Sequence, residues 1–248
     1  MDEGNELALL GGFLFSIAGD SILGISAGSQ RLLAFLAVRD QTMTRQRVAG
    51  TLWPDSTDEH AGANLRAAVA RLGLPTRGAV RVTARDLGLA EGVVVDVHFS
   101  RALAHRLIDG DEPQIDDDIG RSAVDALSRD LLPGWYEDWA VLAAEDWRQL
   151  RVHALEAVAG RLTAADRLAE AAGAALAAVQ AEPLRESARA ALIRVHLAEG
   201  NQSAAIDEFE RYRVLLHAEV ALEPTSRLRA LLDDLRRLQE SGRNSANG

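Results

Sequence analysis

Cysteine and lysine are absent from this chain of 248 residues, and aromatic residues make up only 4% of it. Without cysteine, a disulfide framework, a thiolate metal site and a cysteine nucleophile are excluded. No apolar run approaches the roughly 18 residues that indicate a transmembrane helix, and the N-terminus is acidic where a secretory signal would be basic. We therefore expect a cytoplasmic protein that makes no membrane contact and has one large domain or two modest ones.

The charge is distributed unevenly along the chain. The net charge is −10, and all 27 basic residues are arginines. Residues 28–95 hold nine Arg against six acidic residues, whereas residues 111–248 hold sixteen Arg against 25 acidic residues. A mildly basic segment therefore precedes a strongly acidic remainder. A net charge of +3 over residues 28–95 is a weak electrostatic footprint, so DNA contact would need a second copy or a partner protein.

The N-terminal part has the pattern of a winged helix. Residues 7–25 alternate short apolar runs with Gly and Asp, which predicts two or three short strands. Three helices follow, one at 30–39, one between Thr44 and Pro54, and one around 61–72. Their N-caps are expected from Ser29, Thr44 and one of Ser56, Thr57 and Asp58. Short β-branched runs then predict a wing over Val80–Val95. This order of elements is typical of a DNA-reading module.

The C-terminal part is helical from Ser122, with a break at Leu131–Trp135. Helices are expected at Asp138–Arg161, Thr163–Ala181, Leu184–Glu199, Ser203–Val220 and Ser226–Gln239. Counted from Gly200, the small, aromatic and packing positions of a tetratricopeptide repeat are filled by Ala205, Phe209 and Tyr212. Trp53 is expected in the core, and Trp135, Trp139 and Trp147 are expected to pack between a linker and the helical domain, with a ligand pocket as the alternative.

The fold class is therefore mainly α with a small β component: an N-terminal winged helix followed by a tetratricopeptide-like repeat domain. We place the winged helix in residues 1–109, the helical domain in residues 110–240 and a disordered tail in residues 241–248. The acidic run between Asp109 and Asp118 marks the boundary, because composition and periodicity both change there.

Candidate DNA-binding residues lie on the outer face of the third helix and beside it. The set is Arg45, Arg47, His60, Asn64, Arg66, Ala67, Arg71, Arg77, Arg81 and Arg85. Asn64 is expected to contact a base edge and Arg66 a phosphate. Arg81 and Arg85 on the wing would lie over a minor groove. The alternative for all of them is a solvated surface.

Motifs for other chemistry are missing. The six His residues show no metal-ligand spacing, and the Asp116–Asp118 run lacks the downstream Gly and Glu of a calcium loop. No glycine-rich phosphate loop and no nucleophile elbow occurs. We therefore expect neither an enzyme nor a bound metal or cofactor.

Several motifs, taken in order, resemble the SARP family of bacterial transcription activators. In the first half these are Arg31–Ala37, Val48–Pro54, Ala63–Leu72 and Val95–Phe99. In the second half, Leu132–Trp139, Glu182–Ser187, Ala198–Ile206 and Glu219–Pro224 resemble the bacterial transcriptional activator domain of that family. The resemblance covers roughly residues 7–239 and makes the chain a short-form member, without an ATPase, sensor or receiver domain.

The resemblance implies a winged helix of the response-regulator output type that binds direct repeats in promoter DNA. It also implies that the activator recruits RNA polymerase through the sigma factor and alpha subunit, at secondary-metabolite genes, with a homodimer on DNA as a further expectation. The alternative is an adaptor that does not bind DNA and uses its helical repeats to bind a partner protein. The modest charge of residues 28–95 motivates that alternative.

Overall fold

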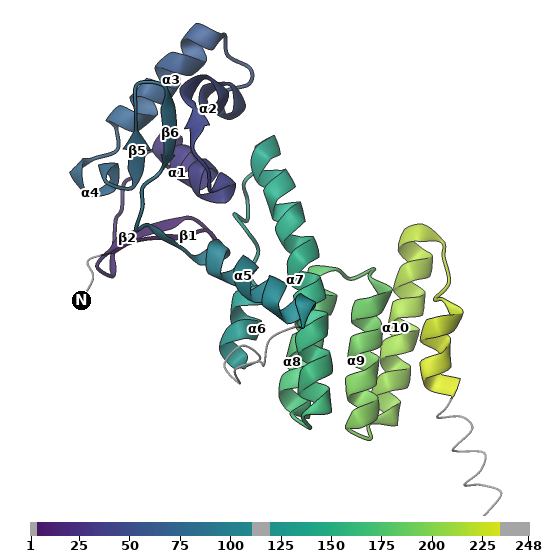
Figure 1. The fold of residues 1–248 in the computed structure, drawn as a ribbon. Coiled ribbons are helices and arrows are strands. Elements are labelled where there is room, and N and C mark those ends of the chain that lie inside the picture. Colours follow the sequence, from purple (N-terminus) through teal and green to yellow (C-terminus); the bar gives the residue numbers. More distant parts are fainter. Residues whose placement is uncertain (1–3, 111–119, 234–248) are drawn as a thin grey trace, which may run out of the picture. The chain divides into compact units, whose positions relative to one another are not determined.

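The computed structural model describes residues 4–110 and 120–233 and is mainly helical, with two small sheets (Figure 1). This confirms the predicted fold class. The chain forms two compact units. The first comprises Met1–Ser100 and Arg129–Trp147, and the second comprises Arg101–Ser128 and Arg148–Gly248.

A four-stranded sheet begins the first unit, in the order β3-β2-β1-β7. Its strands are β1 (Asn5–Ala8), β2 (Leu14–Ile17), β3 (Asp20–Ser21) and β7 (Val94–Val95). β7 pairs with β1 in parallel, so the prediction that this run belongs to the wing is wrong. The Asp96 carboxylate fixes the junction after β7, because it accepts hydrogen bonds from the backbone N–H of Leu9 at 2.9 Å and of Leu10 at 3.0 Å.

Four helices and a second sheet follow in this unit, and the hairpin of that sheet over Val80–Leu89 is the wing (Figure 1). They are α1 (Ala27–Arg39), α2 (Arg45–Leu52), α3 (Asp58–Ala70), α4 (Leu74–Arg77) and a second sheet made of β4 (Met43–Thr44), β6 (Asp86–Leu89) and β5 (Val80–Val82). Thr44 caps α2 as predicted, and of the three candidates for the cap of α3 the structure has Thr57. The cap of α1 is Ser26 and not Ser29, because the buried Ser29 hydroxyl donates to the Ala68 carbonyl at 2.8 Å.

The segment 129–147 completes the core of the first unit. Trp139 packs edge-on against Phe35 of α1, with ring centroids 5.2 Å apart. Leu131 bridges to Leu10, and an ion pair joins Arg31 to Glu137 at 2.8 Å. The expectation that this tryptophan group packs between a linker and the helical domain is therefore wrong for Trp139, whose aromatic contacts are with Phe35 and Trp135.

Trp53 departs from its predicted place in the core. It is half-buried at the C-terminal end of α2, whereas Val48 and Leu52 of the same helix are buried as predicted. The core on this side of the unit therefore depends on aliphatic side chains.

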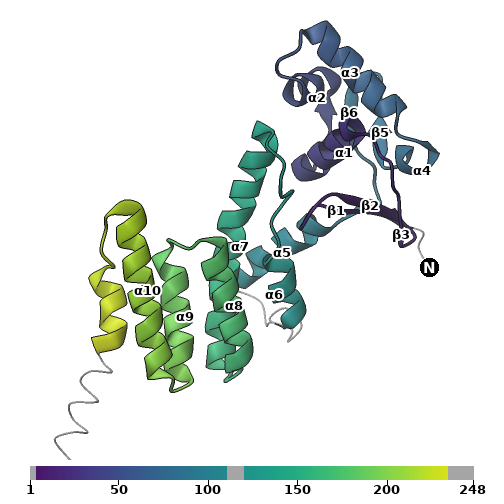
Figure 2. The same ribbon diagram turned by 180° about the vertical axis from the view of Figure 1, so that it is seen from behind.

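The second unit is a stack of helices (Figure 2), of which α8, α9 and α10 lie side by side. The helices are α6 (Arg121–Leu127), α8 (Leu168–Ala181), α9 (Glu186–Ala198), α10 (Gln202–Val220) and a further one over 226–233. Two helices contribute residues to both units, α5 (Asp96–Asp109) and α7 (Asp138–Ala164). The left-handed Asp166 (φ 60°) separates α7 from α8, so the region expected as one helix from Thr163 begins only at Leu168.

The pair α9 and α10 follows the repeat positions expected from Gly200. Ala205, Phe209 and Tyr212 are buried together with Leu228 and Leu232 of the helix at 226–233. The Tyr212 hydroxyl donates to the Leu184 carbonyl at 3.1 Å. Burial raises the pKa of this phenol, and the nearby Glu186 carboxylate adds to the rise. The aromatic side chains therefore join the two helices of this pair to the helix that follows them.

The predicted domain limits stay a prediction. Segment 129–147 lies in the first compact unit, although it follows the expected boundary near residue 110. The expected acidic linker falls largely on residues 111–119, which lie outside the described residues. The expected tail at 241–248 and the end of the last expected helix also lie outside them.

Trp139→Ala is expected to lower the free energy of unfolding of the first unit by about 3–5 kcal/mol, because it leaves a large cavity against α1. Urea unfolding followed by circular dichroism measures this. The control is Tyr136→Ala, since Tyr136 is 85% exposed and should change stability by less than about 0.5 kcal/mol. Equal losses in the two variants would show that Trp139 is not the anchor.

Candidate nucleic-acid interface

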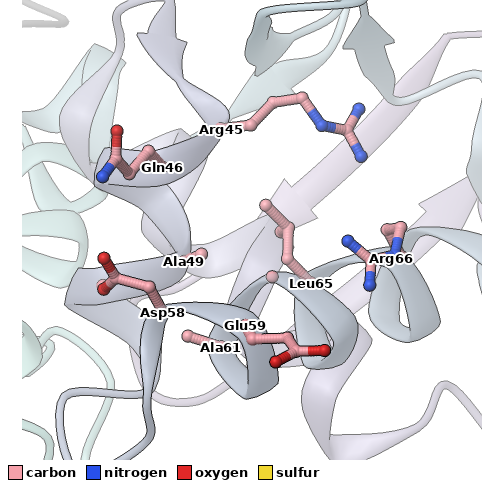
Figure 3. A pocket seen from close by; sticks show the side chains of 10 residues that line it. Arg45, Gln46, Ala49, Asp58, Glu59, Ala61, Leu65 and Arg66 are labelled. Atoms are coloured by element: carbon pink, nitrogen blue, oxygen red, sulfur yellow. The ribbon is translucent and has the colours of Figure 1, made fainter.

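α2 and α3 form a helix-turn-helix whose turn is Trp53–Thr57. Small residues on both helices, Ala49 and Gly50 on α2 and Ala61 and Gly62 on α3, line a hollow of about 430 Å³ between them (Figure 3). The short side chains of these residues permit close approach of the two helices. The buried Leu65 also lines the hollow, together with the polar residues Arg45, Gln46, Asp58, Glu59 and Arg66. The two helices are thus packed as one element that presents α3 outward.

The predicted residues of α3 divide between two faces. His60, Asn64, Ala67 and Arg71 recur at helical spacing, and the first, second and fourth of them are exposed. Arg66 lies elsewhere, because two positions along a helix correspond to a rotation of about 200°. It lines the hollow beside α2 together with Arg45 (Figure 3). The structure therefore places Asn64 and Arg66 on different sides of α3.

The N-terminal turn of α3 is acidic. Asp58 and Glu59 are exposed there, and both line the hollow. Their charges complement the positive end of the helix dipole and stabilise α3. They also oppose the approach of phosphate to that helix end. The Thr57 hydroxyl lies 3.1 Å from His60 Nδ1, which holds the imidazole at this same turn.

Two of the predicted arginines hold the wing in place. Arg81 of β5 donates to the Thr42 hydroxyl at 2.6 Å and pairs with Glu91 at 3.5 Å. Arg45 bonds the turn of the hairpin through its backbone N–H, which donates to the Arg85 carbonyl at 2.9 Å, and through its guanidinium, which reaches the Thr83 carbonyl at 3.4 Å. Arg45 and Arg81 therefore contribute to the orientation of the wing. Thr42 and Thr83 have no local sequence pattern that marks them for this role.

The remaining arginines of the predicted set are exposed and, within the described residues, have no acidic partner. They are Arg47 at the start of α2, Arg66 on α3, Arg71 just after it, Arg77 in α4 and Arg85 in the hairpin turn. Exposed guanidinium groups without carboxylate partners are suited to phosphate oxygens, which they bind with paired hydrogen bonds.

Residues 4–110 and 120–233 contain no group of three His, Asp or Glu side chains that is placed to hold a metal ion. In the same part of the chain, no helix is both long and apolar enough to cross a membrane.

Comparison with known proteins identifies the family. Residues 99–236 match the family described as "Bacterial transcriptional activator domain". No curated protein matches the chain. Among solved structures, EmbR of Mycobacterium tuberculosis, in complex with a low-affinity phosphopeptide, has a TM-score of 0.67 at 19% identity, over 100% of this chain and 70% of that one.

At this identity the likeness to EmbR shows the fold, and the family rests on the domain match, which spans more than half of the chain. It confirms the resemblance to SARP activators seen in the sequence motifs. The chain therefore belongs to the bacterial transcriptional activator domain family and is a transcriptional regulator of the SARP type.

Proposed function

We propose that this regulator binds double-stranded promoter DNA through α3 and the wing, and activates transcription by recruiting RNA polymerase. The observation that carries the proposal is the set of exposed arginines without acidic partners around the helix-turn-helix, at positions 47, 66, 71, 77 and 85. A surface of this kind attracts the phosphate backbone in a sequence-independent way. Arg47 lies at the start of α2 and Arg66 on α3. In a helix-turn-helix the first of these helices crosses the DNA backbone and the second enters the major groove.

In this proposal the outer face of α3 enters the major groove. The side chains of Ala63, Ala67 and Ala70 are short, so the helix backbone can approach the base edges closely. The Asn64 amide can both donate to and accept from an adenine edge. Arg66, on the flank beside α2, would bind a phosphate, and Arg85 in the hairpin turn would contact the backbone beside a minor groove.

The second unit would supply the protein contacts. A regulator that holds promoter and polymerase together raises the effective concentration of polymerase at that promoter. We propose the sigma factor and the alpha subunit as partners and secondary-metabolite genes as targets. The acids Asp58 and Glu59 and the net charge of +3 over residues 28–95 support binding as two copies on direct repeats, because one copy would hold DNA weakly.

A protein-interaction adaptor is the second candidate function. It is favoured by one specific observation, the exposed carboxylates of Asp58 and Glu59 on the first turn of α3. Those charges lie where phosphate would approach a recognition helix. The adaptor would use its helical unit to bind a partner and would leave the helix-turn-helix free of DNA.

The first experiment measures binding of the full chain to fragments of its own and neighbouring promoters at increasing salt. If the five exposed arginines each neutralise one phosphate, the plot of log K against log salt should have a slope of about −4 to −5 per bound copy. Fluorescence anisotropy of labelled fragments gives this slope. Failure to bind any fragment at low salt, with co-purification of a specific protein, would establish the adaptor instead.

A second experiment separates the two sides of α3. Arg66→Ala is expected to weaken binding to all sequences alike and to reduce the salt slope by about 1, because it removes one phosphate contact. Asn64→Ala is expected to leave the slope unchanged and to reduce discrimination at one base pair by about 1–3 kcal/mol.

The matched control is Arg213→Ala on α10. Arg213 pairs with Glu210 three residues earlier and lies far along the chain from α3, so this substitution should leave DNA binding unaffected. If the Asn64→Ala, Arg66→Ala double variant bound its operator as tightly as the wild type, α3 would not be the recognition element.

A further inference from the structure

A groove in the second unit runs along α9. Its walls come from α7 on one side and from the helix at 226–233 on the other. Leu231 is a partly exposed apolar residue in its lining, where Ala190, Ala191 and Leu228 are buried. The volume of the groove is about 260 Å³. This volume lies below the range of about 300–1,000 Å³ that is usual for small-molecule sites. It suits a few side chains of a bound peptide, as the extended surfaces of stacked helical repeats do.

The carboxylates in this groove are already bound within the protein. Glu156 of α7 accepts from the Arg185 guanidinium at 2.9 Å and from the Ser187 hydroxyl at 2.6 Å. Glu186 accepts from the backbone N–H of Thr225 at 2.9 Å and from its hydroxyl. These bonds join α7 to the start of α9 and α9 to the start of the following helix. The two acids therefore hold the walls of the groove together.

The two arginines in the groove differ from these glutamates in their bonding. Arg194 of α9 and Arg227 of the helix at 226–233 are exposed and line the groove. Within residues 4–110 and 120–233, neither has an ion-pair partner. Other arginines of this unit pair with glutamates. Examples are Arg148, Arg167, Arg185, Arg189, Arg211, Arg213 and Arg229.

We propose that this groove binds an acidic segment of a partner protein, with an apolar side chain of the segment against Leu231 and its carboxylates on Arg194 and Arg227. Two guanidinium groups beside a partly exposed leucine complement a segment in which Asp or Glu alternates with apolar residues. Guanidinium binds carboxylate through two parallel hydrogen bonds, which gives both affinity and orientation. The inference rests on the proposed function, in which the second unit binds a partner protein, and it specifies which residue types of that partner would be bound.

The test is a selection of random octapeptides displayed on phage against the immobilised full chain, with the Arg194→Ala, Arg227→Ala variant as counter-target. Peptides carrying Asp or Glu next to an apolar residue should be enriched on the wild type alone. A labelled peptide of the consensus should then bind the wild type at least roughly tenfold more tightly than it binds the double variant, because charged hydrogen bonds are lost. The same peptide with Asn and Gln in place of its acids should bind weakly.

The matched control is Arg229→Ala, on the same helix as Arg227 but paired with Glu223, which should bind the peptide like the wild type. Arg194→Glu with Arg227→Glu should select basic peptides instead. No enrichment, enrichment of peptides without acids, or equal binding to the double variant would each overturn the proposal. Promoter binding by the double variant is measured separately and should be unchanged, so a failure of the groove is distinguishable from a failure of DNA binding.

Discussion

The winged-helix unit depends on a contact between α1 and a segment that lies a hundred residues later in the chain. Trp139 packs edge-on against Phe35, Arg31 forms an ion pair with Glu137, and Leu131 forms an isolated antiparallel bridge with Leu10. The first hundred residues alone therefore leave a face of α1 uncovered. α5 and α7 each contribute residues to both units.

The arginines of the first unit fall into two groups, those that bond within the protein and those that are exposed without an acidic partner in the described residues. Arg45 and Arg81 form bonds within the protein that orient the hairpin, while Arg47, Arg66 and their exposed neighbours are left without acidic partners in the described part of the chain. The acids at the start of α3 stabilise that helix and weaken its attraction for phosphate. A modest net charge with a few well-placed cations is consistent with a regulator that binds as tandem copies.

Local patterns in the sequence predicted the three helices, the cap at Thr44, and the repeat positions around Phe209 and Tyr212, because these features depend on near neighbours. For the cap of α3 they left three candidates. The parallel pairing of β7 with β1 and the packing of Trp139 on Phe35 could not be predicted, since both join residues far apart in the chain. Ser29 was mistaken for a cap because its bond to the Ala68 carbonyl is a tertiary contact. Within the candidate site, the types of residue were readable from the sequence, and helical spacing alone separates Asn64 from Arg66. That Arg66 is the one beside α2 depends on how α3 packs against α2.

The central claim is that the helix-turn-helix and the wing bind promoter DNA, and a hydroxyl-radical footprint of the full chain on its own promoter region tests it most directly. The account predicts protection of two direct repeats, with the protected sugars on one face of the duplex where α3 and the wing contact the backbone. Uniform cleavage of every promoter fragment, at protein concentrations where the chain is folded, would contradict it.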